Sequence, residues 1–96
     1  MLDHVIAFQA DLTPEGEQAL WANLERLRAI PQVRELTIGK NVGTRSQGYD
    51  YCMRITFDSL ADLAIYEDHP VHVEVRAYNR AVTTAHICVD FEFDRV

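Results

Sequence analysis

The sequence predicts an α+β fold with the ferredoxin-like element order βαββαβ around a four-stranded antiparallel sheet. Three observations predict it. Four segments alternate between apolar and polar residues, two segments repeat apolar residues at helical spacing, and each helical segment lies between two strand segments. Two helical crossovers that return to one sheet leave its second face uncovered. Because 96 residues enclose a single core, we expect residues 1–96 to form one domain.

The first strand and the first helix have separate signals. Residues 2–10 alternate as a strand that is buried on at least one side. One of its faces consists of Leu2, His4, Ile6 and Phe8. Thr13 is expected to cap a helix that has Pro14 at its first position and ends before Pro31. The apolar stripe of this helix is Leu20, Leu24, Leu27 and Ile30.

Two further strands follow, separated by a polar loop. Residues 33–40 carry Leu36 and Ile38 before a glycine, which suits a short strand. Residues 41–48 contain two glycines among polar residues and are expected to form the loop. Residues 49–57 have the clearest alternation in the chain. Its apolar positions are Tyr49, Tyr51, Met53, Ile55 and Phe57.

The second helical part is interrupted by a proline. Ser59 and Asp62 resemble a capping box that opens a helix through Tyr66. Pro70 lacks an N–H and disfavours α conformation at the residue before it, so the helix is expected to stop near Asp68 and a second one to begin at Pro70. This second helix is expected to bury Val73, Ala77 and Ala81. Residues 86–94 close the chain as a strand with Ile87, Val89, Phe91 and Phe93 on one face.

Composition and charge narrow the range of partners. The 15 acidic and 9 basic residues give a formal charge of −6, and the basic residues are scattered along the chain, so nucleic acid is a poor partner. The apolar runs are too short to cross a membrane, and the N-terminus lacks the basic and apolar regions of a secretory signal. We therefore expect a cytoplasmic protein that binds neither nucleic acid nor a membrane.

The cysteines and histidines do not indicate a metal centre. Cys52 and Cys88 lie far apart, without a CxxC spacing, and are expected to be buried free thiols. His69 and His72, with a third histidine from a strand, are residue types that bind zinc, but Pro70 prevents their stacking on one helix face. We expect no cofactor and no dedicated metal site, while a weak magnesium or calcium contact at the acidic surface stays open.

The stretch 66–72 carries the most promising chemistry. His72 falls in the first turn of the second helix, where the helix macrodipole favours a neutral imidazole that can accept a proton at pH 7. If the corner at Pro70 brings Tyr66 to the same cavity, a hydroxyl donor and a base face one volume, as proton transfer requires. The alternative is that Tyr66 and His72 only cap and pack the corner. His69 is expected to be exposed or to cap the helix.

Several short motifs occur in a characteristic order. They are His4 in the first strand, Ile30-Pro31-Gln32-Val33, Gly39-Lys40-Asn41, Phe57-Asp58-Ser59, Tyr66-x-x-His69-Pro70-x-His72 and Val89-Asp90-Phe91. Together they resemble the stress-responsive dimeric α/β-barrel family over essentially the whole chain. The resemblance implies a ferredoxin-like fold that pairs into a dimeric barrel. Because apolar residues occur on both faces of the expected sheet, we expect a homodimer formed through the open face.

One branch of this family is a plant polyketide cyclase, which closes a ring by an aldol-type reaction. Position by position, Tyr66 and His72 match the tyrosine and the histidine that transfer protons there, and His4 matches a histidine that lines the cavity. The resemblance thus implies catalytic Tyr66 and His72, with His4 in support, and a small apolar or aromatic carbonyl ligand. The lining that holds a long acyl tail is not found here, so the cyclase's own substrate does not carry over.

Three functions stay open at this point. The first is proton-transfer chemistry without a cofactor, by a cyclase of the lyase class or by an isomerase. The second is a non-catalytic dimer that binds a small molecule or protects under stress, and the third is a dimeric-barrel monooxygenase. The chain has no nucleophile elbow, phosphate loop or dinucleotide fingerprint, which favours the first. For His4, a buried and hydrogen-bonded histidine is the default interpretation, and cavity lining comes second.

Overall fold

The computed structural model describes residues 1–94, which contain one four-stranded antiparallel sheet. The strands are β1 (Leu2–Gln9), β2 (Glu35–Lys40), β3 (Tyr51–Phe57) and β4 (Ala85–Glu92). The helices are α1 (Pro14–Glu25), α2 (Leu60–Asp68) and α3 (Pro70–Val82), and α1 continues into a 3-10 turn, η1 (Arg26–Ala29). The strand order β2-β3-β1-β4, with all neighbours antiparallel, confirms the predicted ferredoxin-like fold class.

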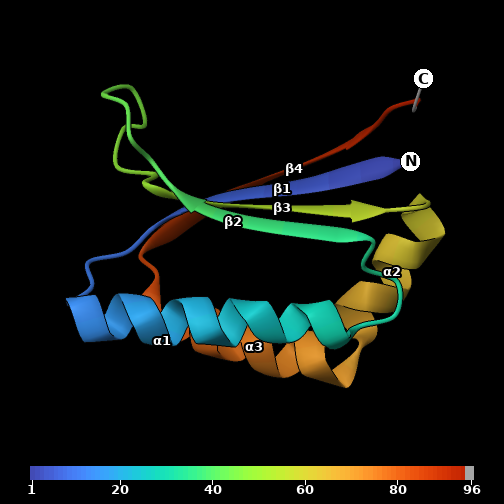
Figure 1. The fold of residues 1–96 in the computed structure, drawn as a ribbon, viewed down its shortest axis with the longest axis horizontal. Coiled ribbons are helices and arrows are strands. Elements are labelled where there is room, and N and C mark those ends of the chain that lie inside the picture. Colours follow the sequence, from blue (N-terminus) through green and yellow to red (C-terminus); the bar gives the residue numbers. More distant parts are fainter. Residues whose placement is uncertain (95–96) are drawn as a thin grey trace.

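The helices cover one face of the sheet. Helices α1 and α3 lie side by side beneath it, and α2 leads from the end of β3 down to the start of α3 (Figure 1). The loop between β2 and β3 rises on the other side, away from the helices. Among the described residues, no helix has both the length and the apolar character needed to cross a membrane.

The core lies between the sheet and this helix layer. The predicted face of β1 points toward the helices, and its residues stand opposite Phe57, Ile55, Met53 and Tyr51 of β3. The predicted apolar stripe of the first helix is fully buried against these strand residues. It runs along α1, through η1 and to the residue after η1. The buried side chains of that stripe are Leu20, Leu24, Leu27 and Ile30. Both sequence patterns are therefore confirmed.

The other sheet face is open and apolar in its β1 and β4 half. The register places Val5 beside Val89 and Ala7 beside Ile87, and Phe91 follows on the same face. Ile87 and Val89 are more than half exposed, and Phe91 is 44% exposed. The apolar face predicted for the last strand is thus the uncovered one.

The predicted helix starts are confirmed at atomic detail. Thr13 Oγ1 accepts a hydrogen bond from the Gly16 amide at 3.1 Å, and Ser59 Oγ accepts one from the Asp62 amide at 3.2 Å. Strand ends differ from the prediction by about two residues. For example, β3 begins at Tyr51 because the preceding residues belong to the loop, where Asp50 Oδ1 accepts from Ser46 Oγ at 2.6 Å.

The buried face predicted for α3 is wrong. Val73, Ala77 and Ala81 are exposed, while Val75 is buried, and Val71 and Val82 pack partly against the core. Both sets are apolar residues at roughly helical spacing, so the pattern did not distinguish them. The contact with α1 decides between them, since Asn23 Nδ2 on α1 donates to the Val75 carbonyl at 3.1 Å.

The prediction of buried cysteines is also wrong, because both thiols are exposed. Cys52 stands opposite Ala7 and faces the open side of the sheet, where no helix covers it. Cys88 faces the helix side, but β4 is an edge strand of the sheet. The structure leaves a cavity there, and Cys88 lines it.

Candidate active site

A cavity of about 260 Å³ lies between the sheet and α3, close to the lower end of the range of small-molecule sites, about 300–1,000 Å³. Its apolar wall comes from Ile6, Leu24, Leu27, Met53 and Val75. Its polar wall comes from the end of α2, from His4 on β1 and from polar residues of α3 and β4. All three predicted site residues, Tyr66, His72 and His4, line it together.

The corner at Pro70 brings Tyr66 and His72 into contact. Helix α2 ends at Asp68, His69 is extended with φ −65° and ψ 137°, and α3 begins at Pro70 as predicted. This change of direction turns the last part of α2 toward the first turn of α3. The ring centroids of Tyr66 and His72 lie 4.4 Å apart.

The backbone determines which nitrogen of His72 carries a proton. Its Nδ1 lies 2.8 Å from the Glu67 carbonyl oxygen, and because a carbonyl can only accept, Nδ1–H is the donor. In the neutral ring, Nε2 then has a free lone pair. Burial lowers the pKa of His72; the Glu67 carbonyl opposes this, and the charge of Arg76 adds to the lowering. Burial therefore favours the neutral imidazole that was expected at this position.

Tyr66 is fully buried and lies between the other two site residues. Its ring is 4.9 Å from that of Phe57 and 6.1 Å from that of His4, measured between centroids. No described residue accepts a hydrogen bond from its hydroxyl group. Burial raises the pKa of Tyr66, and the charge of Glu67 adds to this, so the phenol stays protonated and can donate.

His4 is buried and hydrogen-bonded, and it also lines the cavity. It stands opposite Asp90 in the β1–β4 register, and its Nδ1 donates to Asp90 Oδ1. The two interpretations of His4, a buried and hydrogen-bonded histidine and a cavity-lining one, therefore both describe its position. Cys88 Sγ lies 3.4 Å from the same Nδ1. Burial, followed by the charge of Asp90, raises the pKa of the Cys88 thiol to about 11, so it remains a thiol at neutral pH.

These last three residues also form a group of possible metal ligands. Nδ1 of His4, Sγ of Cys88 and a carboxylate oxygen of Asp90 lie within 4.8 Å of one another, and no other group of this kind occurs in residues 1–94. Imidazole, thiolate and carboxylate suit a zinc-type ion. The donor atoms are already engaged, however, because the His4–Asp90 hydrogen bond occupies Nδ1 and Cys88 holds its proton.

His69 is not part of the cavity. Its Nδ1 accepts a hydrogen bond from the Val71 amide at 3.1 Å, so it caps α3, which was one of the two roles expected for it. Cys88, Arg76 and Arg80 of the cavity, and Asp90 as the partner of His4, were not predicted from the sequence. A usable signal existed, since polar residues alternate with the apolar ones in β4, and the arginines follow His72 at a spacing of four.

A family model described as the stress responsive A/B barrel domain, Dabb, matches residues 3–93. The chain belongs to this family. This result agrees with the resemblance seen in the sequence motifs. It also agrees with the ferredoxin-like strand order of the sheet. No curated protein matches the sequence significantly.

Three solved structures resemble the Dabb chain over nearly its full length. A protein from Arabidopsis thaliana is 24% identical, with a TM-score of 0.88 and coverage of 100% of this chain and 98% of that one. A dimeric ferredoxin-like protein of unknown function from Thermobifida fusca is 23% identical, with a TM-score of 0.84 and coverage of 96% and 90%. The hydroxynitrile lyase of Passiflora edulis is 18% identical, with a TM-score of 0.89 and coverage of 99% and 94%. At these identities, the likeness shows a shared fold.

Proposed function

We propose that this Dabb protein is an enzyme that transfers protons on small carbonyl compounds, in an aldol-type cyclisation or a related lyase or isomerase reaction. One observation carries the proposal: a neutral imidazole with a free Nε2 and a protonated phenol lie 4.4 Å apart, ring to ring, in one cavity. The side chains supply both a base and a hydrogen-bond donor, so the reaction needs no cofactor. The fold that the chain shares with a hydroxynitrile lyase is compatible with such chemistry.

The steps follow from these two groups. His72 Nε2 takes a proton from the carbon beside a carbonyl, and the C–H electron pair becomes the C=C bond of an enolate. The Tyr66 hydroxyl donates a hydrogen bond to the carbonyl oxygen, which gains negative charge. The enolate carbon attacks a second carbonyl carbon of the same molecule and forms a C–C bond. The resulting alkoxide takes the proton back from the His72 imidazolium.

His4 and Asp90 have a supporting role in this proposal. The Asp90 carboxylate holds the His4 ring in one orientation, with Nδ1–H directed to the carboxylate. His4 Nε2 can then accept a hydrogen bond from a substrate hydroxyl. The buried Phe57 ring packs against Tyr66, and such apolar surroundings strengthen a polar interaction of the hydroxyl group.

The test uses two variants with matched shapes, Tyr66→Phe and His72→Gln. Aromatic and polyketide-like carbonyl compounds are screened by thermal shift, and the compounds that bind are followed by mass spectrometry for products of equal mass or of dehydration. With a converted compound in hand, each variant should lose about 100-fold or more in kcat, because a positioned acid or base contributes about 10²–10⁴-fold.

His69→Asn is the matched control, because it removes an imidazole outside the cavity and keeps a residue that caps helices well. Its activity should equal that of the wild type. Turnover should also persist in chelator-treated protein. Unchanged kcat in both cavity variants would refute the proposal, and dependence on added metal, haem or flavin would support the monooxygenase instead.

A non-catalytic binding protein is the second candidate function. The polar and apolar walls of the cavity favour binding of a small molecule whether or not it reacts. In that case the screen should find compounds that raise the melting temperature, and mass spectrometry should find each of them unchanged after hours with the protein.

We also infer that the chain forms a homodimer through its open sheet face. That face exposes the apolar side chains of Ile87, Val89 and Phe91 side by side along β4. A contiguous apolar patch of this kind marks an interface, and a two-fold pair of copies would bury it against itself. The Thermobifida fusca protein with this fold is dimeric.

A further inference from the structure

The basic side chains of this protein fall into two groups. Most of them pair with carboxylates, as expected for a chain with a net charge of −6. The paired residues are Arg26 with Glu74, Arg28 with Glu25, Arg34 with Asp58, Lys40 with Glu17 and Arg54 with Asp3. Arg45, Arg76 and Arg80 have no carboxylate partner among the described residues, and of these three only Arg76 and Arg80 line the cavity.

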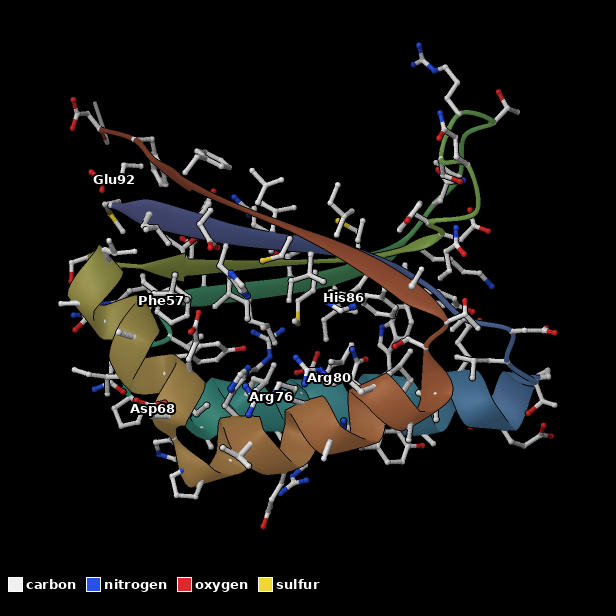
Figure 2. The ribbon with its side chains drawn as sticks, turned by 180° about the vertical axis from the view of Figure 1, so that it is seen from behind. Phe57, Asp68, Arg76, Arg80, His86 and Glu92 are labelled. Carbon is white, nitrogen blue, oxygen red and sulfur yellow. The ribbon has the colours of Figure 1, made fainter. Side chains whose placement is uncertain are left out.

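These two arginines continue the row that begins with His72. Residues 72, 76 and 80 follow one another at a spacing of four on α3, which is about 6 Å along the helix for each step. Figure 2 shows Arg76 and Arg80 on the side of α3 that faces the sheet, with His86 of β4 above Arg80. The cavity therefore has a basic end at Arg76 and Arg80 and a second end at Tyr66 and His72. A small molecule can span the distance between them.

An unpartnered acceptor lies at this basic end. Asn79 Oδ1 is buried and has no hydrogen-bond partner, although its residue lines the cavity between Arg76 and Arg80 in sequence. A buried acceptor without a donor destabilises the protein, and a donor on a bound molecule would relieve this cost. This end of the cavity thus combines two positively charged side chains with an amide acceptor, which suits a ligand that carries an anion and a hydroxyl group.

We propose that Arg76 and Arg80 bind the carboxylate of the substrate, while Asn79 accepts a hydrogen bond from its hydroxyl group. The inference rests on the proposed function in placing the reacting carbonyl at Tyr66 and His72. The substrate is then a small hydroxylated carbonyl compound with a carboxylate at the far end. Guanidinium groups suit this role because their N–H donors match the two oxygens of a carboxylate. His86 adds a ring N–H donor at the same end.

Binding of 3-hydroxybenzoate, measured by titration calorimetry, tests this subsite without any need for turnover. The neutral amide of the same compound is the control ligand and should bind at least tenfold more weakly. Affinity for the carboxylate should fall as sodium chloride is raised from about 20 mM to about 500 mM, and affinity for the amide should not. Both comparisons use the wild-type protein, so they do not depend on the folding of a variant.

Variants then locate the interaction. Arg76→Gln and Arg80→Gln should each weaken binding of the carboxylate at least fivefold and leave binding of the amide unchanged. Arg45→Gln is the matched control, because it removes the same charge from the loop between β2 and β3 and should change neither affinity. Equal affinity for carboxylate and amide, no binding of either, or equal effects of all three variants would each overturn the inference.

One further measurement separates this inference from the proposed function, and another tests which anion binds. The His72→Gln variant should bind 3-hydroxybenzoate as the wild type does, even though its catalysis is expected to be lost. Failure of the catalytic test therefore leaves the binding test intact. If phenyl phosphate binds more tightly than 3-hydroxybenzoate, the inference of a carboxylate is overturned. The two arginines would then bind a phosphate ester.

Discussion

At the scale of residues, one physical cause acts on the two central groups in opposite directions. Burial disfavours the charged form of each, so it lowers the pKa of His72 and raises the pKa of Tyr66. Both side chains are then neutral near pH 7. A neutral imidazole is a base and a neutral phenol is a hydrogen-bond donor, so one apolar environment prepares both partners of a proton transfer.

The lowered pKa of His72 predicts how stability depends on pH. The unfolded chain binds this proton at its ordinary pKa of about 6.5, whereas the folded chain binds it only at lower pH. Stability from the neutral ring is therefore present above about pH 6.5 and is lost as pH falls through the lower, folded pKa. Urea unfolding at about pH 7.5 and about pH 5.5 should show the wild type losing more stability than His72→Gln.

The glutamine variant is a suitable comparison because its amide can still donate to the Glu67 carbonyl, while it has no group that titrates. Changes at other titrating residues cancel between the two proteins. If the free energies of unfolding of the wild type and of His72→Gln change equally across this pH range, the lowered pKa of His72 is contradicted.

At the scale of elements, the corner between α2 and α3 positions the site. The His69 amide donates to the Tyr66 carbonyl at 3.1 Å, and the Val73 amide donates to the His69 carbonyl at 3.0 Å. Together with the cap from His69 Nδ1 to the Val71 amide, these bonds tie the end of one helix to the start of the next. The contact between Tyr66 and His72 depends on this short connection.

Removal of the cap should therefore lower stability. His69→Ala leaves the Val71 amide without its acceptor and should reduce the free energy of unfolding by about 1 kcal/mol, or the melting temperature by about 4–8 °C. His69→Asn should retain most of the wild-type stability, because asparagine is among the best N-cap residues. Thermal and urea unfolding of both variants measure the difference, and an alanine variant as stable as the wild type would exclude the cap.

At the scale of the whole molecule, the sheet separates two surfaces with different roles. The helices cover one side of the sheet and leave the other side open (Figure 1). The helix side holds the cavity, and the open side carries the apolar residues of β1 and β4. Pairing through the open side would leave the cavity on the outer side of each sheet. The two copies could then each bind a ligand without competing for one surface.

The proposed homodimer predicts the effect of a charge on the open face. Light scattering at micromolar concentration should give twice the chain mass of 11.0 kDa for the wild type and a shift toward 11.0 kDa for Val89→Asp. The reason is that a buried, unpaired carboxylate is costly in an apolar interface. Val42→Asp is the control, because Val42 is fully exposed in the loop between β2 and β3. A monomeric wild type would contradict the proposal.

Most of the fold could be predicted from local signals. Alternation identified the strands, Thr13 and Ser59 marked two helix starts, and Pro70 marked the corner, because each of these features depends on residues close together in the chain. The same stretch contained Tyr66 and His72, so these two candidates could be named before the structure was known. Their role in catalysis stays a proposal.

The tertiary structure decided what depends on distant residues. Asp90 is the partner of His4 across 86 positions, and only the β1–β4 register brings the two together. The buried face of α3 was decided by its contact with α1, since Val73 and Val75 are equally apolar. The same rotation of α3 directs Arg76 and Arg80 into the cavity. Local sequence determined the elements and the corner, while packing between elements determined which side chains meet.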